Sequence, residues 1–161
     1  MEFFRARRYH DAIKQARKTL ELEPAFSNAL WCLGKSMIQQ GALDDARTLL
    51  QKAVQYSPEN AIFKADLALV YGKLNVRAEA LRIHSGLKSA QSEGYVSPYA
   101  LALASLALDD REQTLQYLSD AYDQKDPHLI WLNEEVYFDP LRSDIGFDKI
   151  VKKMRFYPRE K

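Results

Sequence analysis

The stretch SNALWCLGKSMIQQGALDDARTLLQKAVQYSPEN, from Ser27 to Asn60, decides the fold of this chain. It places the small residues Gly34 and Ala46 one helical turn from larger apolar ones, which lets two helix axes approach closely. Gly41 marks a turn between two helical segments, and Pro58 cannot continue the second of them. The stretch therefore predicts a pair of antiparallel helices.

The same pattern recurs every 34 residues along the chain, since Ala46 is preceded by Ala12 and followed by Ala80 and Thr114 at this spacing. A single helix pair cannot bury its apolar face alone, so this period predicts pairs that stack upon one another. The expected helices cover residues 1–7 (the remnant of a longer helix), 9–22, 26–40, 43–56, 60–74, 76–90, 97–108 and 111–124.

These motifs resemble the tetratricopeptide repeat (TPR) family, whose pattern is W-x2-L-G-x2-Y, then A-x3-F, then P, over ~34 residues. The unit at 27–60 matches at Gly34, at Ala46-x3-Leu50 and at Pro58, and the neighbouring units keep its phase. The resemblance implies an all-α fold, a right-handed α-solenoid of antiparallel helix pairs with a C-terminal capping segment. It also implies a non-enzymatic scaffold for protein–protein interaction.

The chain divides into a repeat array at 1–127 and a C-terminal segment. Beyond the array, the small-residue pattern gives way to large apolar groups in LIWLNEEVYF, at 129–138. Because the last repeat would otherwise expose an apolar face to water, we expect residues 128–161 to form a helical cap and tail. The units of the array are a partial repeat at 1–24 and repeats at 27–60, 61–94 and 95–127.

The sequences at the two ends of the chain indicate what kind of protein it comes from. The first unit lacks most of its first helix, so we expect the chain to begin inside a longer array; a naturally degenerate first repeat is the alternative. The ending FDPLRSDIGFDKIVKKM resembles the tails of TPR regions in multidomain bacterial regulators, except at Ile145-Gly146, where such tails carry Pro-Arg. That resemblance implies a bacterial source and a lost or separate effector domain.

Composition and charge exclude several classes of function. The net charge of +1 argues against a nucleic-acid binder, and the single Cys32 rules out an internal disulfide framework. No apolar run approaches the ~20 residues that a membrane helix needs, and no secretory signal opens the chain. We therefore expect a cytoplasmic protein without membrane insertion.

No group of side chains forms a recognisable active site. The three histidines lie in different units of the chain without a second ligand one turn away, and His84 occupies the packing position that Leu50 fills in the preceding unit. Adjacent helical residues point about 100° apart, so acidic pairs do not converge as catalytic carboxylates do. We expect no enzyme, no metal and no cofactor, and we interpret as solvated caps the acidic pairs at 44–45, 109–110 and 134–135.

The first helix of each pair lines the concave side of a stacked array, and the family resemblance implies that ligands bind there. Some family members hold a peptide carboxylate with basic residues, but the matching positions here are Cys32, Ile62 and Asp66, so a receptor for acidic chaperone tails is not expected. Aromatic residues concentrate interface energy, which favours Trp31 and Tyr99 as anchors. We predict that a partner peptide or helix contacts Asn28, Trp31, Lys35, Ile38, Gln39, Ile62, Leu69, Lys73, Tyr99 and Leu103.

Two alternatives would bury this same apolar surface within the protein. The C-terminal segment around Trp131, Tyr137 and Phe138 could fold back over part of the groove. Two chains could instead bury the groove as a homodimer. The sequence leaves both open, so a structural self-association module of a bacterial regulator is the alternative function.

Overall fold

The computed structural model describes residues 9–133 and 135–154, and the expected helical remnant at 1–7 lies outside these ranges. Over the described residues the chain is helical, which confirms the all-α prediction, and each helix lies within about three residues of its expected bounds. The elements in chain order are α2 (Tyr9–Leu22), α3 (Ser27–Gln39), α4 (Leu43–Tyr56), α5 (Ala61–Lys73), α6 (Arg77–Glu93), α7 (Pro98–Leu106), α8 (Arg111–Asp123), the 3-10 helices η1 (Pro127–Trp131) and η2 (Val136–Leu141), and α9 (Ile145–Lys153).

Small residues of one repeat phase occupy the places where paired helices cross. Ala46, Ala80 and Thr114 are each 0% exposed, as the 34-residue period predicts. The contact is closest at Gly72 of α5, where a Cβ atom would lie 2.3 Å from the carbonyl oxygen of Ala107 at the end of α7. Glycine and alanine at these crossings therefore set how closely the pairs stack.

The turn inside each helix pair repeats with the same period. Gly41, Asn75 and Asp109 are spaced by 34 residues and have φ angles of 77°, 59° and 59°. This left-handed backbone region is open to glycine and tolerated by asparagine and aspartate, but disfavoured for other residues. A side-chain cap follows at the start of several helices, with Asn60 capping α5 and Asp110 capping α8. The residues at the turns and at these helix starts therefore determine the backbone conformation there.

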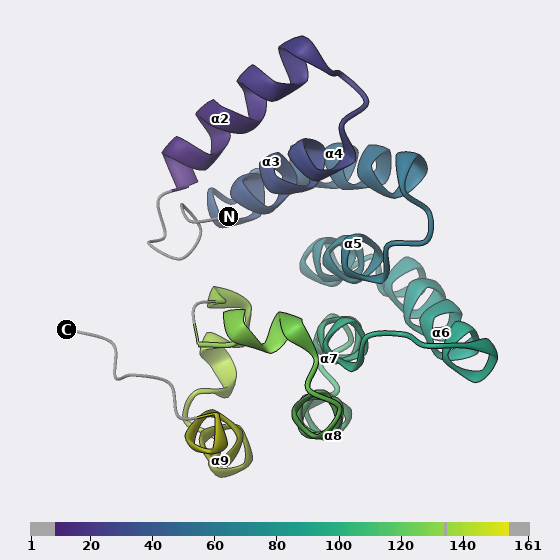
Figure 1. The fold of residues 1–161 in the computed structure, drawn as a ribbon, viewed down its shortest axis with the longest axis vertical. Coiled ribbons are helices and arrows are strands. Elements are labelled where there is room, and N and C mark those ends of the chain that lie inside the picture. The colour runs from purple at the N-terminus through teal and green to yellow at the C-terminus, as the bar shows by residue number, and fades with distance from the viewer. Residues whose placement is uncertain (1–8, 134, 155–161) are drawn as a thin grey trace.

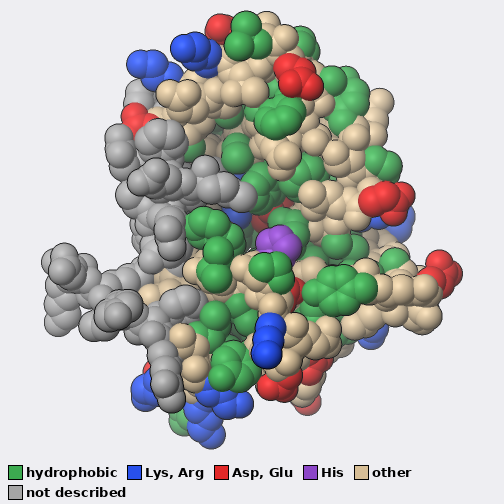
Figure 2. Space-filling model, in the orientation of Figure 1, with side chains coloured by type: hydrophobic (Ala, Val, Ile, Leu, Met, Phe, Trp, Pro, Cys, Tyr) green, Lys and Arg blue, Asp and Glu red, His purple; other side chains and the backbone are tan. Residues whose placement is uncertain are grey.

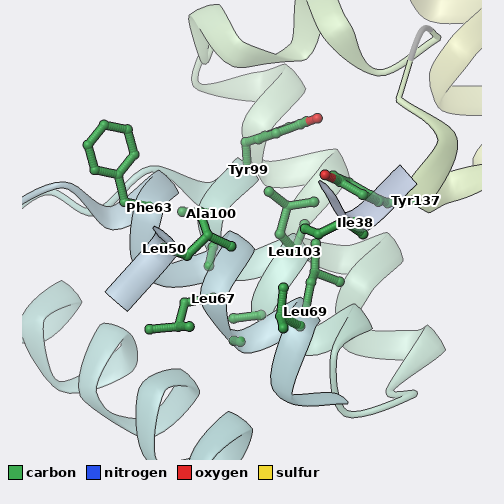
Figure 3. Close-up of a cluster of buried hydrophobic side chains, with 14 of the residues drawn as sticks. Ile38, Leu50, Phe63, Leu67, Leu69, Tyr99, Ala100, Leu103 and Tyr137 are labelled. Atoms are coloured by element: carbon green, nitrogen blue, oxygen red, sulfur yellow. The ribbon is translucent and has the colours of Figure 1, made fainter. Parts of the chain in front are cut away.

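The helix pairs follow a curve, and the chain after α8 turns back inside it (Figure 1). We call residues 127–154 the tail; they comprise η1, η2 and α9, and α9 packs on α8. Phe138 and Leu132 of the tail are 0% exposed. Tyr137 joins a buried cluster that includes Ile38 of α3 and Leu103 of α7 (Figure 3). The tail therefore covers part of the concave face, the first of the two alternatives that the sequence left open.

The face of the molecule that Figure 2 shows is mixed in character. Hydrophobic side chains gather across its middle, whereas most lysine and arginine side chains lie nearer its edges (Figure 2). In the described ranges, none of the helices combines the length and apolar character that crossing a bilayer requires.

Candidate functional site

A pocket of about 130 Å³ remains open where the tail meets the first helices of three successive pairs. We call it the aromatic pocket, because aromatic side chains from α3, α5, α7 and η1 contribute to its walls. The residues that line it are Asn28, Trp31, Lys35, Asn60, Ile62, Phe63, Tyr99, Leu103, His128, Trp131 and Glu135.

Ring contacts hold the aromatic walls in place. Trp31 stacks on Phe63 with ring centroids 5.4 Å apart, which ties α3 to α5. Tyr99 of α7 stacks on the His128 ring at 6.1 Å and meets Phe138 edge-on at 5.9 Å. Such contacts add to the free energy of area burial and restrict the rings to one orientation. The pocket is therefore a preformed feature of the folded chain.

A buried carboxylate lies behind the Trp31 wall. The indole Nε1 of Trp31 donates a hydrogen bond of 2.5 Å to Oδ2 of Asp66, which is 0% exposed. The other carboxylate oxygen, Oδ1, accepts no hydrogen bond from the described residues. Burial raises the pKa of Asp66 from 3.8 to about 6, although Lys35 and the Trp31 hydrogen bond oppose that shift.

Lys35 joins the repeat array to the tail. Its Nζ lies 2.6 Å from Oε1 of Glu135, and it sits over the rings of Trp31 and Tyr137 at 5.1 and 5.2 Å. Burial alone would lower the pKa of this ammonium, but the charges of Glu135 and Asp66 outweigh burial and hold the pKa above its usual value. Lys35 is therefore a charged group within the fold, paired with the tail.

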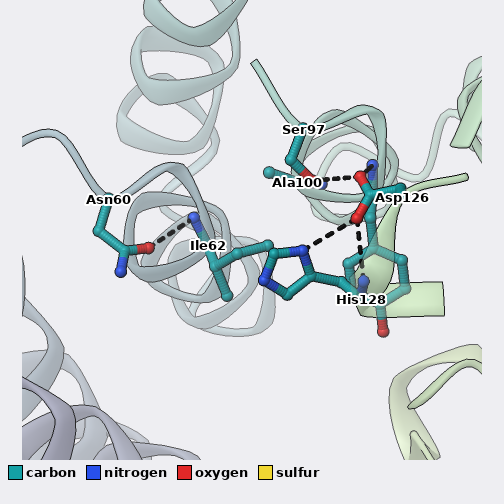
Figure 4. A network of polar contacts seen from close by, with 7 residues as sticks. Asn60, Ile62, Ser97, Ala100, Asp126 and His128 are labelled. Carbon is teal, nitrogen blue, oxygen red and sulfur yellow. Dashed lines mark hydrogen bonds and ion pairs between the residues drawn. The ribbon is translucent and has the colours of Figure 1, made fainter. Parts of the chain in front are cut away.

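A second polar network fixes the start of the tail against α7 (Figure 4). Oδ2 of Asp126 accepts hydrogen bonds from Ser97 Oγ at 2.6 Å and from the backbone N–H of Tyr99 at 3.2 Å. Its Oδ1 accepts from the backbone N–H of His128 and lies 2.9 Å from Nδ1 of that ring. Burial would raise the pKa of Asp126, but these hydrogen bonds outweigh it and lower the pKa to about 2. Asp126 thus orients His128 at the pocket.

The structure places the ten predicted contact residues in three settings. Leu69 and Lys73 line a separate hollow beside Val136 and Tyr137 of the tail. Ile38 is buried, and Gln39 is half-buried at the end of α3. For all ten residues, contact with a partner stays a prediction. The residues that line the aromatic pocket are Asn28, Trp31, Lys35, Ile62, Tyr99 and Leu103.

Sequence reasoning missed the residues that complete the pocket. Phe63 is the neighbour of a predicted contact residue, and its helical phase gave no sign that it would stack on Trp31. Glu135 was interpreted as part of a solvated cap, yet it lines the pocket, as His128 does. The one available signal was the dense apolar run at 129–138, which contains Trp131 and predicts that this segment packs against the array.

Two further side chains that could react or bind a metal, His84 and Cys32, are packed within the fold. Nε2 of His84 lies 3.1 Å from Oγ of Ser105, and the His84 side chain is buried as the repeat phase predicts. Cys32 is half-buried, and burial raises the pKa of its thiol. Across the described residues, no three histidine, cysteine, aspartate or glutamate side chains gather in a way that could hold a metal ion.

Stacked antiparallel helix pairs with a pocket on the concave face define a helical-repeat protein. A family model described as Tetratricopeptide repeat matches residues 3–61. Together with the period and packing of the described helices, this match supports a tetratricopeptide repeat protein. Its repeats indicate a protein–protein interaction module, and the family is generally composed of non-enzymatic scaffolds. No curated protein matches the chain.

The buried Asp66 predicts an unusual dependence of stability on pH. Because its pKa is about 6 in the folded chain and 3.8 ordinarily, the native state binds more protons than the unfolded state between these values. The free energy of unfolding should therefore fall as pH rises from 4 to 6, by up to about 1.4 kcal/mol per pH unit, relative to Asp66→Asn. Urea denaturation of both proteins across this range measures the difference, and a difference independent of pH would contradict it.

Proposed function

We propose that this chain binds a peptide or helix of a partner protein in the aromatic pocket, as a non-enzymatic scaffold within a larger bacterial regulatory protein. The observation that carries the proposal is the pocket itself, which stays open on the concave face although the tail covers part of that face. Mostly apolar walls with a few polar groups are typical of sites that take one side chain of a ligand.

The tail itself is a poor candidate for a displaceable ligand. Phe138 and Leu132 are 0% exposed, and Leu129 and Leu141 are nearly so. Exposing four such side chains would cost about 6–12 kcal/mol at ~1.5–3 kcal/mol each, which exceeds what a weak peptide interaction supplies. We therefore infer that partners bind beside the tail, in the opening that it leaves.

The test begins with selection of binding peptides from a displayed random library against the full chain. Trp131→Ala removes one wall of the pocket, and we expect it to weaken a selected peptide at least tenfold, because buried aromatic groups dominate interface energy. Ile130→Ala is the matched control, since Ile130 lies next to it in η1, is 51% exposed and is not part of the pocket lining. Fluorescence anisotropy with a labelled peptide measures both affinities.

Equal affinity of the two variants would contradict binding in the aromatic pocket, provided that circular dichroism melting shows both to be folded. Self-association is the alternative function. A molecular mass that doubles with concentration in analytical ultracentrifugation, together with failure to select any peptide, would favour it.

A further inference from the structure

The surroundings of the aromatic pocket carry more negative than positive charge. Among the described residues that line it or bond directly to its lining, three are carboxylates, Asp66, Asp126 and Glu135, and two are cations, Lys35 and Arg142, the latter donating from Nη2 to the backbone carbonyl of Glu135. Asp126 and Asp66 are 4% and 0% exposed, so water screens them poorly. The described charged groups around the pocket therefore favour a positively charged group over a negatively charged one.

Two buried oxygen atoms near the pocket also lack hydrogen-bond donors. Oδ1 of Asp66 and the hydroxyl of Tyr99 have no hydrogen-bond partner among the described residues. Tyr99 lines the pocket and is 3% exposed, and Asp66 lies behind the Trp31 wall. Buried polar atoms without partners are uncommon in folded proteins. The described residues around the pocket therefore leave the hydrogen-bonding capacity of both atoms unmet.

The protein itself shows how this environment accommodates a cation. The ammonium group of Lys35 lies over the rings of Trp31 and Tyr137 and is paired with Glu135 at 2.6 Å. Aromatic faces attract cations through the ring quadrupole, and the attraction grows when water is excluded. The pocket offers the same two elements to a group from outside, since its lining holds aromatic walls and the carboxylate of Glu135.

We propose that the aromatic pocket accepts a positively charged side chain, arginine above all, from the partner segment. The proposal deepens the proposed function and rests on it. A planar guanidinium group can stack on the tryptophan and tyrosine rings while its N–H groups face the carboxylate side of the pocket. A neutral apolar side chain would fill the same walls without gaining from the charges, and an acidic one would be repelled by them.

Tryptophan fluorescence can report on this pocket directly, because the two tryptophans of the sequence, Trp31 and Trp131, both line it. The probes are the tripeptides N-acetyl-Gly-Arg-Gly-amide and its analogues with norleucine or glutamate at the centre. We expect the arginine peptide to change the emission of the full chain saturably at millimolar concentration. The norleucine peptide should require an at least tenfold higher concentration to produce the same change in emission. The affinity of the arginine peptide should fall as salt is added.

Variants that add a charge at the rim of the aromatic pocket test whether the arginine peptide binds there. Asn28 lines the pocket and is exposed, so Asn28→Lys should weaken the arginine peptide at least threefold, because it adds a positive charge beside the bound guanidinium. Thr48→Lys adds the same charge on α4, outside the pocket lining, and is expected to have no effect.

Three results would overturn this inference. They are equal binding of the norleucine peptide, no binding of the arginine peptide, and equal weakening by Asn28→Lys and Thr48→Lys. None of them decides the proposed function, because peptides selected from the library and the Trp131→Ala variant test groove binding whatever charge the peptide carries.

Discussion

Replacing Phe138 with alanine is expected to lower the free energy of unfolding by about 3–5 kcal/mol, the range for large aromatic side chains removed from a core. Phe138 is 0% exposed and packs against Tyr99 and Phe147, with ring centroids 5.9 Å away in both cases. It is among the largest fully buried side chains. Its removal leaves a cavity between α7, which belongs to the repeat array, and the tail. Denaturation in guanidinium chloride measures the loss.

Ile145→Ala is the matched control for this prediction. Ile145 also belongs to the tail, but it is 73% exposed, so its truncation should change the free energy of unfolding by no more than about 0.5 kcal/mol. If both variants unfold at the same denaturant concentration as the wild type, the tail is not packed on the array, and the boundaries of the aromatic pocket are wrong.

Gly72→Ala should also be strongly destabilising, by about 3 kcal/mol, although alanine favours a helix over glycine by about 1 kcal/mol. The added Cβ would lie 2.3 Å from the carbonyl oxygen of Ala107, a backbone atom that cannot rotate away. The α5–α7 packing would have to open. Thermal unfolding followed by circular dichroism gives the comparison with the wild type.

Gly34→Ala offers the contrast, because its Cβ would meet the side chain of Leu50 at 2.8 Å rather than a backbone atom. Leu50 is fully buried but can adjust its rotamer, so we expect a smaller loss of about 1 kcal/mol. A Gly72→Ala protein as stable as the wild type would mean that neighbouring repeats stack less closely than described.

The helices of the repeat array could be predicted because their turns and their apolar periodicity are visible in the sequence. Helix bounds follow from turns such as Gly41 and from the apolar periodicity, and the burial of Ala46 and Ala80 follows from one repeat phase. Even the bulky position of His84 was assigned correctly, because Leu50 and Leu118 fill it in other units. Each of these features follows either from a local turn or from the 34-residue period, and both can be seen in the sequence.

The candidate site was predicted only in part, because the tail has no period. Lys35 and Glu135 are separated by 100 residues, and no spacing rule connects them. Trp31 was expected to present its ring to a partner, yet it is 6% exposed, since Asp66 accepts its N–H and Phe63 stacks on its ring. Long-range polar pairs of this kind decide which groove residues remain available.

The central claim is that partner segments bind in the aromatic pocket, and hydrogen exchange of the full chain with and without a library-selected peptide tests it most directly. We expect the peptide to slow amide exchange in η1 and in the first turns of α3 and α5, which surround the pocket. Exchange in α4 and α6 should stay unchanged, because no residue of either helix lines it. Protection confined to α4 and α6 would contradict the account.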